Sequence, residues 1–159
     1  MSVFGFVENI PKDPIFHLNT LFSADERLDK LNLGVGAYKT EELTPYLLKS
    51  VSKADERLAQ RHLNKEYLPM RGLKPFYEKA QQLVFGEHLD SIASRLASSQ
   101  TVGGTGGLRV FGELLMRLGW TSIHVSTPTW ANHGAIFEDV GLKVESYPYY
   151  NRQTHDIEF

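Results

Sequence analysis

The sequence predicts an α/β fold in which a mainly parallel sheet is flanked by helices, and three observations predict it. The length of 159 residues with 42% hydrophobic content suffices for one buried core. From Leu96 onward, strand-like and helix-like runs alternate: strand 96–102, helix 105–118, strand 122–126, helix 132–140 and strand 143–147. Strands separated by a helix pair in parallel through right-handed crossovers.

The chain begins with a segment that has no regular periodicity. Residues 1–14 are rich in aromatic residues and proline, which predicts an extended arm that packs either on its own domain or on a partner subunit. Asp13 and Pro14 are an N-cap and first-turn signal for a short helix. A brief strand is expected at 30–33, and a glycine-containing loop at 34–38.

Two longer amphipathic helices are expected between this loop and the alternating region. The first follows a cap signal at Thr44 and Pro45 and runs to about Leu63, with apolar residues recurring at spacings of three and four. The second spans 73–84 and is closed by Gly86 in the C′ position.

Composition excludes several classes of function. The net charge of −2, with acidic and basic residues interspersed, provides no field that would attract nucleic acid or an anionic membrane. The chain has no cysteine, and its histidines show no metal-ligand spacing, so no metal site is expected. The sequence contains no signal-peptide pattern and no apolar run of membrane-spanning length, so a cytoplasmic location is expected.

The most informative segment is the glycine-rich run Gly103–Gly107, which lies between an expected strand and an expected helix. Amide groups at such a helix start can bind a phosphate, and the hydroxyl of Thr105 could contribute. The loop 127–130 follows the next strand and should open at the same sheet edge, where Trp130 could stack on a planar ring. These residues alone leave open a simple strand-to-helix connection and a core role for Trp130.

Four motifs in order resemble the N-terminal part of the aspartate and aromatic amino acid aminotransferases, which are fold-type I enzymes that use pyridoxal 5′-phosphate (PLP). The resemblance covers nearly the whole chain. The motifs are Asn32-Leu33-Gly34-Val35-Gly36-Ala37-Tyr38-Lys39, Asn64-Lys65-Glu66-Tyr67-Leu68-Pro69, Gly103-Gly104-Thr105-Gly106 and Pro128-Thr129-Trp130-Ala131-Asn132-His133.

The resemblance implies a role for each matching residue. Gly104 and Thr105 would hold the PLP phosphate, and Trp130 would stack on the pyridine ring and also border the substrate. Gly36 would offer its backbone to the substrate α-carboxylate. Tyr67 would reach the phosphate in the neighbouring subunit of a homodimer, so that the site is shared between subunits.

The resemblance also implies that His133 supports the carboxylate that contacts the pyridine nitrogen. Residues 1–45 would form the arm and part of a small domain, and 46–159 the first half of the large PLP-binding domain. The Schiff-base lysine and the substrate-binding arginine of the family match no position here, so the chain is expected to be an N-terminal fragment that contains no catalytic residue and is inactive alone. The intact enzyme would move an amino group between an L-amino acid, aspartate or aromatic, and a 2-oxo acid such as 2-oxoglutarate.

Two alternatives belong to other classes. A non-catalytic module could bind PLP or another phosphorylated ligand in the same crevice. A nucleotide-binding domain is disfavoured, because the glycines do not fit the dinucleotide fingerprint and no Lys-Ser or Lys-Thr follows them as in a P-loop.

Overall fold

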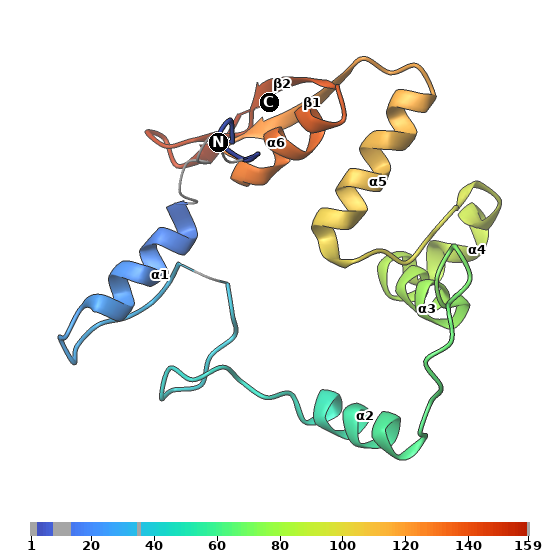
Figure 1. The fold of residues 1–159 in the computed structure, drawn as a ribbon, viewed down its shortest axis with the longest axis horizontal. Coiled ribbons are helices and arrows are strands. Elements are labelled where there is room, and N and C mark those ends of the chain that lie inside the picture. The colour runs from blue at the N-terminus through green and yellow to red at the C-terminus, as the bar shows by residue number, and fades with distance from the viewer. Residues whose placement is uncertain (1–2, 8–13, 35, 159) are drawn as a thin grey trace. The chain divides into compact units, whose positions relative to one another are not determined.

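The structure is a computed structural model that describes residues 3–7, 14–34 and 36–158. Contacts divide the chain into two compact units, residues 1–65 and 66–159, and each is considered separately below. The longer elements are the helices α1 (Pro14–Ala24), α2 (Lys49–Gln60), α3 (Lys74–Phe85), α5 (Gly103–Arg117) and α6 (Ala131–Asp139), and the strands β1 (Ser122–Thr127) and β2 (Lys143–Pro148) (Figure 1). The shorter ones are η1 (Gly86–His88), α4 (Leu89–Ile92), η2 (Ala93–Arg95), β3 (Tyr150–Asn151) and β4 (Asp156–Ile157).

The first helix is confirmed and begins at Pro14, as the sequence predicts. Its expected cap, Asp13, lies outside the described residues. The described start of the arm is not fully extended, because the amide of Val7 donates a hydrogen bond to the carbonyl of Phe4 at 3.1 Å and closes a turn. The rest of the arm, residues 8–13, also lies outside the described part.

The strand predicted at 30–33 is wrong, because the polar side chains of this segment bind α1 and the segment joins no strand ladder. The Lys30 ammonium donates hydrogen bonds to the carbonyls of Phe22 and Asp25 at 2.7 and 2.6 Å. Asn32 Nδ2 donates to Asn19 Oδ1 at 2.8 Å. These bonds satisfy carbonyls near the end of α1 and leave 30–33 as an irregular connection.

The predicted helix start behind Thr44 and Pro45 is also wrong, since α2 begins only at Lys49. The cap candidates form a small antiparallel turn instead. The amide of Thr40 donates to the carbonyl of Thr44 at 2.8 Å, the two threonine hydroxyls lie 2.9 Å apart, and the amide of Tyr46 donates to the carbonyl of Tyr38 at 2.8 Å. A threonine hydroxyl that bonds across a turn is not available to cap a helix. The helix also ends before the expected limit, at Gln60.

The second unit begins with α3, which forms one residue later than predicted and ends at Gly86 with a positive φ of 50°. The strand predicted at 96–102 does not form. Leu96 has extended dihedral angles, but the segment bonds to a loop, where the amide of Gln100 donates to the carbonyl of Arg71 at 2.9 Å. An apolar run becomes a strand only with a ladder partner, and the described residues supply none for this one.

The remainder of the second unit is a β-α-β arrangement that the sequence predicts correctly. Strands β1 and β2 pair in parallel, with a register that runs from Ser122 opposite Lys143 to Thr127 opposite Pro148. Helix α6 connects them and buries Phe137, which is 4% exposed, beside Leu142, which is 2% exposed. The antiparallel pair β3–β4, which follows β2 in the chain, is not predicted by the sequence pattern.

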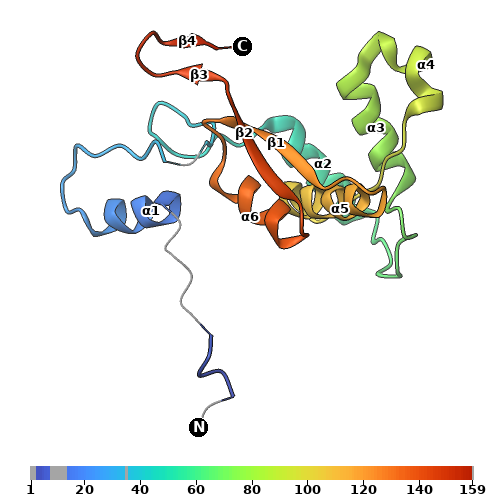
Figure 2. The same ribbon diagram turned by 90° about the horizontal axis from the view of Figure 1, so that it is seen from above.

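Helix α5 packs against α6 through a close approach at Gly112. A Cβ atom added there would lie 2.9 Å from Val140 Cγ2 and 3.3 Å from Phe137 Cδ1. Both views show α5 and α6 running in the same direction (Figures 1 and 2). Among the helices described, none is both long and apolar enough to cross a membrane.

Candidate cofactor site

The start of α5 provides three amide donors. The helix begins at Gly103, two residues earlier than predicted, so Gly104 and Thr105 lie within its first turn. Gly103 has a φ of +63°, which favours glycine at this position. The first bond of the helix joins the amide of Gly106 to the carbonyl of Val102 at 3.2 Å. Within the described part of the chain, the preceding amides have no acceptor, as expected for a free helix N-terminus.

The space in front of these amides is open. A Cβ atom added to Gly104 would meet no atom within 4 Å, and Thr105 is exposed. The Thr101 hydroxyl donates to the carbonyl of Gly103 at 3.2 Å and fixes the backbone just before the first turn. Because a helix N-terminus carries about half a positive charge, this arrangement suits a phosphate group.

The second part of the site is the loop between β1 and α6. The Thr127–Pro128 peptide is cis, and the Ser126 hydroxyl donates to the carbonyl of Pro128 at 3.1 Å. Trp130 occupies the N-cap position of α6 with extended dihedral angles. Its side chain is 38% exposed, so Trp130 is not a core residue in the structure.

His133 lies one helical turn after Trp130 and is half-buried. The two rings meet edge to face, with centroids 5.4 Å apart and an interplanar angle of 90°. His133 Nδ1 lies 2.7 Å from the hydroxyl of Thr129. Thr129 is a residue that the sequence prediction missed, although its spacing of four from His133 at a helix start indicates such a contact.

The packing of the two helices brings both parts of the site to the same end. Thr105 precedes Gly112 by seven residues, and Trp130 precedes Phe137 by seven. At 1.5 Å per residue, each lies about 10 Å along its helix from the contact between α5 and α6. Because the two helices run in the same direction, their first turns, with Thr105 in α5 and Trp130 at the N-cap of α6, lie at the same end of the pair.

The residues that follow Tyr67 lie near the start of α5. The Tyr67 side chain is 99% exposed. The residues after it, Leu68–Met70, share a groove of about 290 Å³ with Gln100, Thr101 and Val102, which directly precede α5. Gly36 belongs to the first unit, whereas the other predicted site residues belong to the second.

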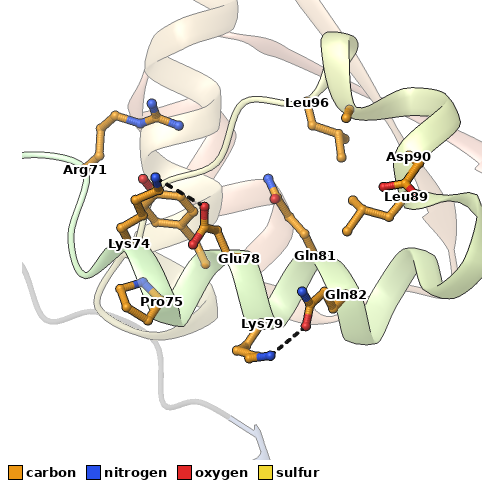
Figure 3. A pocket seen from close by; sticks show the side chains of 12 residues that line it. Arg71, Lys74, Pro75, Glu78, Lys79, Gln81, Gln82, Leu89, Asp90 and Leu96 are labelled. Carbon is orange, nitrogen blue, oxygen red and sulfur yellow. Dashed lines mark hydrogen bonds and ion pairs between the residues drawn. The ribbon is translucent and has the colours of Figure 1, made fainter.

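A cavity of about 590 Å³ lies elsewhere in the second unit, between α3 and α4 (Figure 3). Its two lysines are bound within α3: Lys74 pairs with Glu78 at 3.6 Å, and Lys79 donates to Gln82 Oε1 at 2.9 Å. Arg71, which also lines it, donates to the carbonyl of Ser98. The cavity contains none of the predicted site residues. Polar side chains that bind one another along one helix do not converge on a ligand, so we assign this cavity no function.

A charged cluster lies on the sheet, where His124 and Glu145 face each other across β1 and β2. Glu145 accepts from Lys143 Nζ at 2.6 Å and from His124 Nε2 at 3.0 Å. The hydrogen bond from Lys143 lowers the pKa of Glu145 from its ordinary value of 4.5, and in return raises the pKa of Lys143. Across the described ranges, no three side chains are grouped as a metal site would require.

A parallel β-α-β unit with free amide donors at a helix start is typical of proteins that bind phosphorylated ligands. Comparison with known sequences makes this specific. A family profile described as aminotransferase class I and II matches residues 28–159. The chain therefore belongs to the class I and II aminotransferase family.

Curated relatives and solved structures agree with this family. The chain is 43% identical to the mitochondrial aspartate aminotransferase of Xenopus tropicalis, over 99% of this chain and 38% of that protein. It is 39% identical to the aspartate aminotransferase of Pseudomonas aeruginosa, over 99% of this chain and 40% of that protein. The chain thus spans about two-fifths of the length of these relatives.

The fold matches solved aminotransferases over the same share. The aromatic amino acid aminotransferase of Psychrobacter sp. B6, cocrystallised with aspartic acid, superposes with a TM-score of 0.90 and 37% identity, over 98% of this chain and 40% of that one. The aromatic amino acid aminotransferase of Burkholderia pseudomallei, covalently bound to pyridoxal phosphate, gives a TM-score of 0.87 and 38% identity, over 97% of this chain and 39% of that one.

Proposed function

We propose that the intact protein is a PLP-dependent aminotransferase that moves an amino group between an L-amino acid, aspartate or aromatic, and a 2-oxo acid such as 2-oxoglutarate. The observation that carries the proposal is the common end of α5 and α6, where free amides and the Trp130 ring lie in a chain that belongs to the aminotransferase family.

The residues at this end fit PLP. The amides of Gly104 and Thr105 and the Thr105 hydroxyl would bind the phosphate, since the helix start leaves these donors unpaired within the described ranges and the space before them is open. Trp130 would cover the pyridine ring, and such aromatic contacts contribute about 0.5–1.5 kcal/mol beyond the area that they bury. Bound PLP would supply the electron sink for the chemistry at the amino acid α-carbon.

The remaining roles follow from the family resemblance. His133 would support the carboxylate that contacts the pyridine nitrogen. Gly36 would bind the substrate α-carboxylate through its backbone, and Tyr67 would reach the phosphate in the partner of a homodimer. The near-complete exposure of Tyr67 supports a contact outside its own unit.

Three broader expectations are part of the proposal. Residues 1–45 and 46–159 would belong to different domains of the intact protein. We also propose a cytoplasmic location, although the names of its relatives include mitochondrial and chloroplastic forms. The 159-residue polypeptide by itself would be inactive, because none of its lysines matches the Schiff-base position of the family.

The proposal is tested by incubating the intact purified protein with PLP, aspartate and 2-oxoglutarate and measuring glutamate. Parallel reactions contain phenylalanine or tyrosine in place of aspartate. Glutamate formation from at least one donor is expected, with none from the 159-residue polypeptide alone. An intact protein that binds PLP but transfers no amino group would support the non-catalytic module instead.

The site itself is tested with Thr105→Val. A hydrogen bond to a charged group contributes about 1.5–3 kcal/mol, so we expect PLP affinity to fall about 10- to 100-fold. Thr154→Val is the matched control, because Thr154 lies in the exposed β3–β4 turn and only its amide makes a bond there. Equal PLP affinity in both variants would contradict the assignment of Thr105.

A further inference from the structure

We propose that Arg71 is a positioning residue for the proposed phosphate site. Its side chain binds the loop that carries Tyr67 (residues 66–72) to the residues that precede α5 (98–102), and so fixes the place of the first turn of that helix. The effect on PLP binding rests on the proposed function, whereas the contacts of Arg71 do not.

Arg71 lies in the loop before α3 and contacts a backbone carbonyl 27 residues further along the chain (Figure 3). Its Nε and Nη2 both donate to the carbonyl of Ser98, at 3.2 and 3.0 Å. The guanidinium carbon lies 5.2 Å from the centroid of the Tyr77 ring, so a side chain of α3 contacts the same group from a second side. Two N–H bonds and an aromatic contact together define the plane of the guanidinium.

Backbone bonds beside Arg71 connect the same two segments. The amide of Gln100 donates to the carbonyl of Arg71 at 2.9 Å, and the amide of Leu73 donates to Gln100 Oε1 at 2.9 Å. The amide of Gly72 donates to the carbonyl of Pro69 at 2.7 Å and closes a turn around Arg71. The Arg71 side chain extends this connection by two residues, from Gln100 to Ser98.

The residues that Arg71 binds lead directly into the start of α5. The Thr101 hydroxyl donates to the carbonyl of Gly103 at 3.2 Å, and the first turn of the helix contains Gly104 and Thr105. A turn this rich in glycine has little stability of its own, because glycine loses more conformational freedom on ordering than any other residue. Arg71 therefore stabilises, before phosphate binds, the segment from which the phosphate donors emerge.

The role requires the geometry of the guanidinium and not only its charge. A positive charge also attracts a phosphate at a distance, and that attraction needs no particular orientation. Lysine is a compact charge on a flexible stem, whereas arginine presents several N–H groups in a plane and stacks on aromatic rings. Arg71→Lys keeps the charge and loses the paired bonds to Ser98, so it separates the two explanations.

The first measurement is amide hydrogen exchange of the intact protein without PLP, in native protein, Arg71→Lys and Arg71→Gln. We expect exchange about 3- to 10-fold faster at Gly72, Leu73 and Gln100 in both variants, because loss of one hydrogen bond in an exposed position shifts local opening by about that factor. The amides of β1 should keep their rates. Faster exchange that extends equally to β1 would indicate general destabilisation and would contradict a local role.

The second measurement is PLP affinity, determined by equilibrium dialysis. We expect it to fall about 3- to 10-fold in Arg71→Lys and Arg71→Gln, because the phosphate donors are no longer held in place before binding. At saturating PLP, kcat should stay within about twofold of the native value, since a positioning contact for the cofactor phosphate acts on binding more than on the chemical step.

Two controls match these variants. Arg117→Gln removes the same charge from the last turn of α5, about 18 Å along the helix from Thr105, and should leave PLP affinity unchanged. Tyr77→Phe keeps the ring that contacts the guanidinium and should behave as the native protein, whereas Tyr77→Leu removes the ring and should reproduce part of the loss.

The outcomes separate this inference from the proposed function. Unchanged exchange in a folded Arg71→Lys variant, or PLP affinity that Arg71→Lys leaves intact, would overturn the inference even if the protein transfers amino groups. An intact native protein that binds no PLP would refute the proposed function, and exchange alone would then decide whether Arg71 positions the start of α5. Tyr77→Leu provides the same readings if neither Arg71 variant folds.

Discussion

The contact of Gly112 with α6 allows a stability prediction in which two effects of opposite sign compete. Replacing glycine by alanine within a helix normally stabilises it by about 0.8–1 kcal/mol. At Gly112, the new methyl group would lie 2.9 Å from Val140 Cγ2 and 3.3 Å from Phe137 Cδ1. Overpacking of a close contact costs about 1–3 kcal/mol, so we expect Gly112→Ala to destabilise the protein by a net amount of about 1 kcal/mol.

Gly134 is the matched control within α6. A Cβ atom added there would meet no atom within 4 Å, so only the gain in helix propensity applies. Gly134→Ala should therefore stabilise the protein by up to about 1 kcal/mol. The two variants carry the same chemical change in neighbouring helices, and their unfolding free energies should differ by about 2 kcal/mol.

The measurement is urea denaturation of the intact protein and both variants, followed by far-ultraviolet circular dichroism. The midpoint should fall for Gly112→Ala and rise for Gly134→Ala, with unchanged slopes. If Gly112→Ala were as stabilising as Gly134→Ala, the close packing of α5 on α6 would be refuted. The argument that brings Thr105 and Trp130 to the same end would then lose its basis.

Two further predictions concern other contacts. Gly72→Ala should destabilise the protein by about 2–4 kcal/mol, because left-handed backbone strain and overpacking add, and a new Cβ would lie 2.3 Å from Gln100 Cβ at a φ of +83°. Gly86→Ala, at a φ of +50° with no atom within 4 Å, should cost only the strain, and equal losses in thermal unfolding would contradict the close approach at Gly72. Glu145→Gln should lower stability at neutral pH and lose its effect in acid, because a lowered carboxyl pKa stabilises the fold above the ordinary value of 4.5 and this stabilisation disappears as pH falls through the folded pKa. Because the pKa of Lys143 is raised, its contribution to stability is lost as pH rises through the pKa of Lys143 in the folded protein. A stability difference between native protein and variant that persists in acid would contradict this assignment.

The sequence correctly predicts the elements whose structure follows from the residue pattern within the element itself. Helices α3 and α6 and the parallel pair β1–β2 form within one or two residues of their expected bounds. The incorrect predictions concern segments whose structure depends on contacts with another part of the fold. Residues 96–102 have a strand-like pattern without a described ladder partner, and Lys30 and Asn32 bind α1 through contacts that no periodicity encodes.

The candidate site shows the same division. The common end for Thr105 and Trp130 follows from parallel topology, so sequence reasoning reaches it. The Thr129 contact depends on a side-chain rotamer at a helix start and emerges only from coordinates. The proposed roles of Gly36 and Tyr67 depend on contacts beyond their own units, and neither the sequence pattern nor either unit considered alone contains those contacts.

The hydrogen bonds between residues 71–73 and 98–100 couple the movement of two segments. Arg71 Nη2 donates to the carbonyl of Ser98 at 3.0 Å, and the amide of Leu73 donates to Gln100 Oε1 at 2.9 Å. These hydrogen bonds connect the segment after Tyr67 to the residues that directly precede α5. A ligand that immobilises the start of that helix therefore also restrains the Tyr67 loop, and digestion by trypsin at Arg71 should slow when the ligand binds.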